Sequence, residues 1–218
     1  MAVSRLMKEL KEGEITMLLG VPLLFNKLAA GILKGIKSKG PFVYGIMKFL
    51  MGLSFMIKKT FGVNPGKHIF KAVLKQANIY TIRIAICGGG PLAKSVFRFY
   101  NEMGIDFVQG YGLTETAPIV CVRPIVDPVM RNVGTPLRGM QVRVVDDDGI
   151  ILGRCKKGNL QIKGGCVMQG YYKRPDLTDK VMTVDGWFDT GDIAILTVDG
   201  EIQLRGRKKD TIVLLGGE

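Results

Sequence analysis

Residues 81–112 read TIRIAICGGGPLAKSVFRFYNEMGIDFVQGYG, and this stretch decides the fold class. A β-branched run is followed by a glycine turn. Helical spacing over residues 92–103 then leads to a second short strand at 105–109, and Gly104 favours the end of the helix. The order strand, glycine turn, helix, strand, glycine turn is typical of a parallel α/β sheet, in which ligands bind beyond the carboxyl ends of the strands.

Upstream of this stretch the sequence predicts two helices and a strand. Residues 2–12 have helical spacing, and the run ITMLL predicts a buried strand at 15–19. Pro22 suits the first turn of a helix that ends near residue 36.

The stretch FVYGIMKFLMGLSFMIKKTFG at 42–62 is apolar with interspersed lysines. Its uninterrupted apolar runs are shorter than the roughly 20 residues of a membrane-spanning helix. Three interpretations are open: a core helix or helical pair, a helix in a membrane interface with lysines towards anionic headgroups, or a nucleic-acid contact. The last is disfavoured, because almost every positive charge is a lysine and no arginines alternate with the aromatic residues.

After residue 128 the helical signal ends and the sequence predicts short strands. The runs MQVRVVDDDG, GNLQIKGG, GWFDTGDIAIL and GEIQLRGR have the alternation of strands. Asp199 and Gly200 stand between two of them and favour a tight hairpin. Residues 129–205 are therefore expected to form a small antiparallel, barrel-like β unit.

The charge of the chain is uneven. The formal net charge is +12, and there is no acidic residue from position 15 to position 101. Hydrophobic and charged contents of 47% and 23% are ordinary for a globular protein. The four cysteines have no paired spacing, so neither a zinc site nor a disulfide framework is indicated, and reduced thiols in the cytoplasm are expected. The N-terminus is too charged for a signal peptide.

The second glycine turn combines a ring, a hydroxyl and a carboxylate. Gly110 and Gly112 would let the backbone approach a ligand closely, and Tyr111 offers a flat face. Thr114 can donate to a phosphate oxygen, and Glu115 is a hard ligand suited to Mg²⁺. The plain alternative is a turn in which Thr114 caps the next segment and Glu115 is solvated.

Three further motifs could serve a nucleotide, and each also has a plain interpretation. The first glycine turn, which is a simple turn in many proteins, contains Gly88, Gly89, Gly90 and Pro91. FDTGD at 188–192 places Asp192 where it could accept hydrogen bonds from two ribose hydroxyls, unless the motif is an ordinary Asx turn. GRKKD at 206–210 is otherwise a solvated basic loop.

Four motifs stand in the order seen in adenylate-forming, or AMP-binding, enzymes. They are GGGPL at 88–92, QGYGLTETAP at 109–118, DGWFDTGDIAIL at 185–196 and GRKKDTIVLLGGE at 206–218. The chain resembles this superfamily of acyl-CoA synthetases, luciferase-like enzymes and peptide-synthetase adenylation domains over essentially its whole length. The long segment between VPLLF and GGGPL resembles the helical insertion of long-chain fatty acyl-CoA synthetases.

The resemblance implies a role for each matching residue. Residues 88–91 would flank adenine and help to line the acyl tunnel, and Tyr111 would stack on adenine. Thr114 would contact phosphate, and Glu115 would hold Mg²⁺; these two are the expected catalytic residues. The remaining matches are Asp192 for the ribose hydroxyls, Arg207 beside the ribose, Gly110 and Gly112 at the nucleotide, and Asp210 at the hinge to a C-terminal domain.

The implied chemistry is attack of a fatty acid carboxylate on the α-phosphate of ATP, release of pyrophosphate, and thioester formation with coenzyme A. Other acyl, aryl or amino-acid activating relatives are the alternative within the superfamily. A non-catalytic membrane-binding or interaction module is the alternative from another class, and nucleic acid is not an expected partner.

The family's phosphate loop and the catalytic lysine of its C-terminal domain are absent from this sequence. We therefore expect an internal fragment of the large N-terminal domain, inactive alone and prone to self-association. The expected organisation is an α/β portion at 1–128 with a basic helical insertion at about 30–78, a β-rich portion at 129–205, and the hinge at 206–218. The expected location is cytoplasmic, with the insertion against an anionic membrane surface at the inner face of the membrane.

Overall fold

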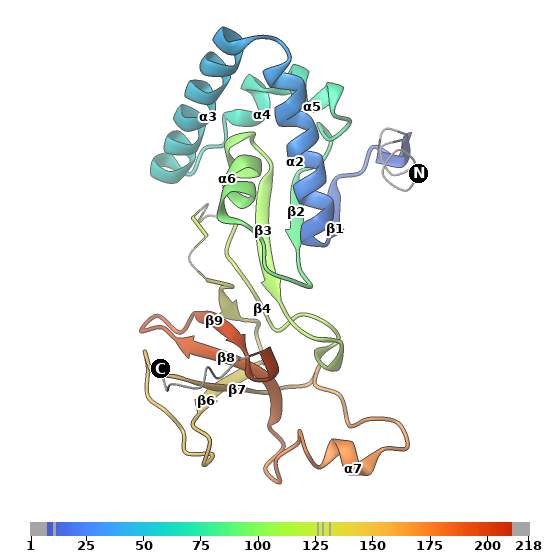
Figure 1. The fold of residues 1–218 in the computed structure, drawn as a ribbon, viewed down its shortest axis with the longest axis vertical. Coiled ribbons are helices and arrows are strands. Elements are labelled where there is room, and N and C mark those ends of the chain that lie inside the picture. Colours follow the sequence, from blue (N-terminus) through green and yellow to red (C-terminus); the bar gives the residue numbers. More distant parts are fainter. Residues whose placement is uncertain (1–7, 11, 126, 128, 131, 211–218) are drawn as a thin grey trace. The chain divides into compact units, whose positions relative to one another are not determined.

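A computed structural model describes residues 8–10, 12–125, 127, 129–130 and 132–210. The chain divides into two compact units (Figure 1). Unit 1 consists of Met1–Gln109 and Pro124–Met130, and unit 2 of Gly110–Arg123 and Arg131–Glu218. This division differs from the expected boundary near residue 128, because the chain leaves unit 1 after Gln109 and returns to it only briefly.

Unit 1 contains the parallel strands that the sequence predicts. Strand β1 (Met17–Gly20) pairs in parallel with β2 (Ile84–Cys87), and β2 pairs in parallel with β3 (Asp106–Tyr111). The first residues of all three strands are in register, with Met17 opposite Ile84 and Ile84 opposite Asp106. The predicted parallel α/β sheet is confirmed.

Unit 1 contains the helices α2 (Pro22–Lys37), α3 (Pro41–Phe61), α4 (Gly66–Ile69), α5 (Lys71–Gln76) and α6 (Lys94–Glu102). Helix α2 begins at Pro22 as predicted. Helix α6 is shorter than the predicted 92–103, because Ala93 is still extended (φ −66°, ψ 133°). Of the predicted helix at 2–12, the described residues 8–10 and 12 are helical, and the rest lies outside the described residues.

The core of unit 1 is built on three aromatic rings from α2, α6 and β3. The Phe107 ring stacks on Tyr100 at 4.7 Å and meets Phe25 edge-on at 4.8 Å. The Tyr100 hydroxyl donates to the Phe25 carbonyl at 2.8 Å, so its one polar atom is satisfied inside the core. This packing holds α2 and α6 against β3, although α2 is far from the other two elements in the sequence.

Residues 41–61 form the single helix α3, so the helical pair that was one of the open interpretations is wrong. The helix is also not buried as a core helix would be. Of its 21 residues only Met51, Ser54 and Lys58 are buried. The interpretation of 42–62 as core therefore holds for one narrow face only. The opposite face carries large apolar side chains exposed to solvent.

Unit 2 is formed by β strands. The end of β3 pairs with β4 (Cys121–Val122), and β4 pairs with β5 (Thr135–Pro136), both antiparallel. A separate antiparallel sheet has the order β6 (Gln141–Val145), β7 (Lys157–Lys163), β8 (Phe188–Leu196), β9 (Ile202–Arg207). Shorter elements are the 3₁₀ turns η1 (Thr114–Thr116) and η2 (Lys208–Asp210) and the helix α7 (Pro175–Thr178).

The predicted antiparallel unit is confirmed, but the barrel-like closure is wrong. Among the described residues no pairing joins β6 to β9, so the four strands form an open sheet. The predicted hairpin joins β8 to β9, with the N–H of Thr197 donating to the carbonyl of Glu201 at 2.9 Å and Gly200 at φ 80°. The sheet stays open because four strands are too few to enclose an interior that side chains could fill, for which about eight are needed.

Candidate functional site

The GYGLTE loop in unit 2 is held by glycine and by a threonine that the sequence did not single out. A Cβ at Gly112 would lie 1.7 Å from the carbonyl oxygen of Pro118, so only glycine fits there. The buried Thr116 hydroxyl accepts from the N–H of Leu113 at 2.9 Å and lies 3.0 Å from the carbonyl oxygens of Leu113 and Pro118. The loop is therefore pinned at both ends.

Within this loop, Thr114 and Glu115 point to different surroundings. Thr114 begins η1 and is exposed, whereas Glu115 is half-buried. The Tyr171 hydroxyl donates to the Glu115 carboxylate at 2.9 Å, and the N–H of Met168 donates to the Glu115 carbonyl at 2.8 Å. Glu115 is thus oriented by the segment that follows β7, and the interpretation of it as fully solvated is wrong.

Tyr171 is a site residue that sequence reasoning missed. Partial burial raises the pKa of Tyr171, and the hydrogen bond to Glu115 raises it further. The hydroxyl therefore stays a donor at neutral pH. The only signal in the sequence is an aromatic pair, Tyr171 and Tyr172, after a glycine. Nothing in that pattern indicates a contact with a residue 56 positions earlier.

Asp192 lies at the centre of a second cluster, on β8. Its Oδ2 accepts a hydrogen bond from the Tyr111 hydroxyl at 2.5 Å, and its Oδ1 accepts one from Nε of Arg207 at 2.9 Å. The pairing of Asp192 with Arg207 across β8 and β9 sets this geometry. Unit 2 therefore brings three of the residues predicted from the sequence into one hydrogen-bonded group.

The backbone next to Asp192 is fixed by Thr190. The N–H of Asp192 donates to the Thr190 hydroxyl at 3.0 Å, which itself donates to the carbonyl of Leu160 on β7 at 2.9 Å. These bonds hold Asp192 at a defined depth in the sheet, with its side chain 8% exposed. The Arg207 side chain is 55% exposed, so the cluster opens to solvent on the arginine side.

The electrostatics of this cluster leave the carboxylate able to take further donors. Burial, together with the hydrogen bond to Asp192, raises the pKa of Tyr111 far above its usual value, so the phenol remains a donor. A carboxylate has about four acceptor positions, and Tyr111 and Arg207 use two of them. Two neighbouring hydroxyls of a ligand match the remaining capacity.

Tyr111 is less open than its expected role as an adenine platform requires. The residue is 9% exposed and packs in a core cluster with Val120, Cys121 and Leu160. The hydroxyl is held by Asp192. Stacking of Tyr111 on adenine stays a prediction.

The first glycine turn belongs to unit 1. Gly88 follows β2 and donates its N–H to the carbonyl of Gly20 at 3.1 Å, and Gly89 has φ 75°. A Cβ at Gly90 would lie 3.5 Å from the ring of Pro22, an ordinary contact. The turn thus packs beside the start of α2, and the proposed role of residues 88–91 stays a prediction.

The remaining predicted residues lie at the end of the described chain and within a strand pair. Asp210 ends η2, and residues 211–218 of the expected hinge lie outside the described residues. Gly110 pairs with Val122 within β3 and β4. In the described part of the chain no group of three His, Cys, Asp or Glu side chains could hold a metal ion by itself.

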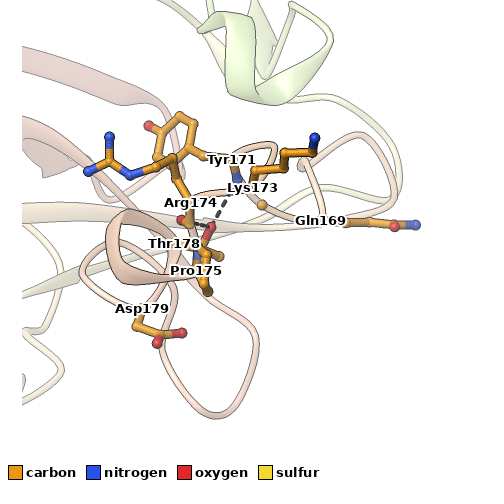
Figure 2. A pocket seen from close by; sticks show the side chains of 8 residues that line it. Gln169, Tyr171, Lys173, Arg174, Pro175, Thr178 and Asp179 are labelled. Carbon is orange, nitrogen blue, oxygen red and sulfur yellow. Dashed lines mark hydrogen bonds between the residues drawn. The ribbon is translucent and has the colours of Figure 1, made fainter.

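A surface pocket of about 350 Å³ lies beside Tyr171 in unit 2 (Figure 2). Thr178 organises it: the N–H of Tyr171 donates to the Thr178 hydroxyl at 2.9 Å, and that hydroxyl lies 3.1 Å from the carbonyl of Arg174. Arg174 is occupied by a double contact with Asp176 at 2.8 Å. The hydrogen bonds of Thr178 hold the segment that contains Tyr171 in place.

Comparison with known proteins identifies related sequences. The family model described as AMP-binding enzyme matches residues 1–172. A long-chain-fatty-acid–CoA ligase of Yersinia pestis is 40% identical in an alignment of 162 residues that covers 71% of this chain and 28% of that protein. A long-chain-fatty-acid–[acyl-carrier-protein] ligase, AEE15, of Arabidopsis thaliana is 37% identical, covering 70% of this chain and 22% of that protein. The chain thus spans about a quarter of the length of these relatives.

Solved structures share the fold. ATP-bound MatB from Rhodopseudomonas palustris superposes with a TM-score of 0.68 at 24% identity, covering 97% of this chain and 34% of that one. O-succinylbenzoate coenzyme A synthetase from Bacillus subtilis, in complex with AMP, gives 0.66 at 21% identity, covering 97% and 35%. At these identities the likeness establishes the fold.

Proposed function

Because the chain belongs to the AMP-binding enzyme family, we propose that it is part of a long-chain fatty acid–CoA ligase. Such an enzyme activates a fatty acid with ATP to an acyl-adenylate and then forms acyl-CoA. The relatives named for long-chain fatty acid ligation support the substrate class. The observation that carries the proposal is the buried Asp192, held by Tyr111 and Arg207 with acceptor capacity left for a ribose.

The residues of unit 2 would bind the nucleotide and hold its charge. Asp192 would accept the two ribose hydroxyls, and Arg207, opening to solvent, would lie beside the ribose. Thr114, exposed at the start of η1, is free to donate to a phosphate oxygen. These groups act by alignment and by stabilising negative charge that develops at the phosphates.

Mg²⁺ fits Glu115. Proteins bind this ion through one or two carboxylates together with substrate phosphates, and the second oxygen of Glu115 has no partner among the described residues. The Tyr171 hydroxyl would hold the carboxylate in place while it binds. When bound, the ion would neutralise charge on the phosphates.

The acyl acceptor has a second candidate. One relative is named as an acyl-carrier-protein ligase, at 37% identity against 40% for a CoA ligase. Acyl transfer to the thiol of a carrier protein uses the same adenylate. Product assays with coenzyme A and with acyl carrier protein, run on the protein that contains this chain together with a phosphate loop and lysine-bearing domain, separate the two acceptors.

The first test is nucleotide binding. Arg207→Ala and Asp192→Asn should each weaken AMP binding by about tenfold, the factor that corresponds to loss of one charged hydrogen bond of about 1.4 kcal/mol. Isothermal titration calorimetry measures the dissociation constants. Arg205→Ala is the matched control, since it removes the same charge from an exposed position of β9. Among the described residues the Arg205 guanidinium donates to Gln203 at 2.8 Å and not to Asp192.

Unchanged AMP affinity in both variants would remove Asp192 from the proposed site. The chain by itself should release no pyrophosphate from ATP and palmitate, because it contains no phosphate loop or catalytic lysine. Fatty acid-dependent pyrophosphate release by the chain alone would contradict that part of the proposal.

A further inference from the structure

Helix α3 in unit 1 has two faces of opposite character. The inner face packs on α2 and α6 and contains Met51, Ser54 and Lys58. Lys58 anchors it, because its ammonium group donates to Oδ1 of Asn101 at 2.8 Å and to Oδ1 of Asp106 at 2.7 Å. This lysine, although part of a Lys-Lys pair, is 5% exposed and is not a surface charge.

The outer face is a continuous apolar stripe. It consists of Phe42, Ile46, Phe49, Leu53 and Met56, which are spaced four, three, four and three residues apart and so lie on one side of the helix. Phe42 is 79% and Phe49 71% exposed, far above what a side chain in a packed core would be. Figure 1 shows α3 beside α6. At 100° per residue, the stripe lies on the opposite side of the helix from the buried Met51, Ser54 and Lys58.

Length and composition alone would allow α3 to cross a membrane, since it has 21 residues and its most apolar 18-residue stretch has a mean hydropathy of 1.3. Only 17% of that stretch is buried. Crossing would pull Lys58 away from Asp106 and Asn101 and leave a charge in hydrocarbon. A helix that keeps its inner face packed can only lie along a surface. The geometry therefore favours an interfacial position.

The charges around the stripe define the surface that fits it. Lys48 and Lys59 are exposed at the flank of α3, and neither forms an ion pair with a described residue. Further exposed lysines precede α3, at the end of α2 and in the connection between the two helices, namely Lys34, Lys37 and Lys39. Positions 15–101 contain no acidic residue. Glu102 of α6 lines a pocket together with Lys48, but its carboxylate is paired with Arg98 at 2.7 Å.

We propose that α3 is a docking surface for anionic lipid bilayers. Its apolar stripe inserts into the boundary between headgroups and acyl chains, and the flanking lysines contact the lipid phosphates. The apolar stripe is complementary to the acyl chains of an anionic bilayer, and the positive border is complementary to its phosphates. The inference rests on unit 1 alone and is independent of the nucleotide site in unit 2.

Tryptophan fluorescence tests where the chain meets the bilayer. With the signal of the single native Trp187 subtracted, Phe49→Trp should shift to shorter wavelength on vesicles of phosphatidylcholine with 30% phosphatidylglycerol. Lipids brominated on the acyl chain should quench it. Val198→Trp, at an equally exposed position in the β8–β9 hairpin, is the matched control and should do neither.

Vesicle co-sedimentation measures how much the apolar stripe and the flanking lysines each contribute to membrane binding. Phe42→Ser combined with Phe49→Ser should abolish binding. Lys48→Gln combined with Lys59→Gln should lower the partition coefficient about 25-fold, from about fivefold for each lysine near an anionic surface. Lys156→Gln combined with Lys157→Gln removes the same charge from an exposed part of unit 2 and should change it less than about twofold.

Circular dichroism must first show that the variants are folded, which is expected because every substituted side chain is exposed. Binding that is equal for pure phosphatidylcholine, or unaffected by the two serine substitutions, overturns the proposal. So does a self-associated chain that binds no vesicles and becomes monomeric with the same serines, since the stripe would then contact a second copy. Loss of vesicle binding confined to the α3 variants supports it.

Discussion

At the scale of single residues, the site in unit 2 depends on contacts between side chains distant in sequence. Tyr111, Asp192 and Arg207 come from three strands, and the bonds between them span 81 and 15 positions. The residue types and their motifs could be predicted from the sequence. Their partners could not, because the bonds that Tyr171 donates to Glu115 and Thr190 donates to Leu160 depend on tertiary contacts that no local pattern encodes.

Gly112 provides the sharpest test at this scale. Gly112→Ala should lower the free energy of unfolding by about 3 kcal/mol, the upper end for overpacking, because its Cβ would meet the Pro118 carbonyl at 1.7 Å. Urea denaturation measures the change. Gly165→Ala is the control in unit 2, since a Cβ there meets nothing within 4 Å; equal effects would contradict the close approach.

At the scale of elements, helices and strands were predicted well where their sequence pattern is local. Helix α2 begins at Pro22, and β2 lies within the β-branched run at 81–87. Strands β6 to β9 correspond to the four alternating runs. Strands β4 and β5 were missed, because each has only two residues and is defined by its pairing. The environment of α3 could not be decided from the sequence for a related reason: hydropathy alone does not say which face of a helix is covered.

The adjacent lysines of α3 separate burial from composition. Lys58→Met should destabilise unit 1 by about 2 kcal/mol, because Asn101 and Asp106 lose a charged donor, although Asp106 is 36% exposed and partly compensated by water. Lys59→Met, one position away and exposed, should change the stability by less than about 0.5 kcal/mol. Thermal unfolding of both variants measures the difference, and similar values would refute the anchoring role of Lys58.

At the scale of the whole molecule, each of the two units has its own core. The core of unit 1 contains Cys87, and that of unit 2 contains Cys121. Burial raises the pKa of Cys87 to about 11 and that of Cys121 to about 12. Each buried thiol therefore reports on the opening of one unit.

Thiol modification at pH 8 should accordingly proceed in stages. Exposed Cys155 should react first with a disulfide reagent, and half-buried Cys166, with its sulfur 3.1 Å from that of Met140, should react more slowly. Cys87 and Cys121 should react only as their unit unfolds, since both protonation and burial protect them. Mass spectrometry during a urea series identifies each site. Modification of Cys121 as fast as Cys155 in native buffer would contradict the packing of unit 2.

The sequence by itself determined the class of the fold, the order of the strands along the chain, and the motifs of the family, because these depend on periodicity and on residues close together in the chain. Only the tertiary structure decided that the GYGLTE loop belongs with the β-rich unit, that the sheet stays open, and that Lys58 is buried while Lys59 is not. The physical reason is that burial and hydrogen-bond partnership are set by which distant surfaces meet, and a local pattern carries no record of that encounter.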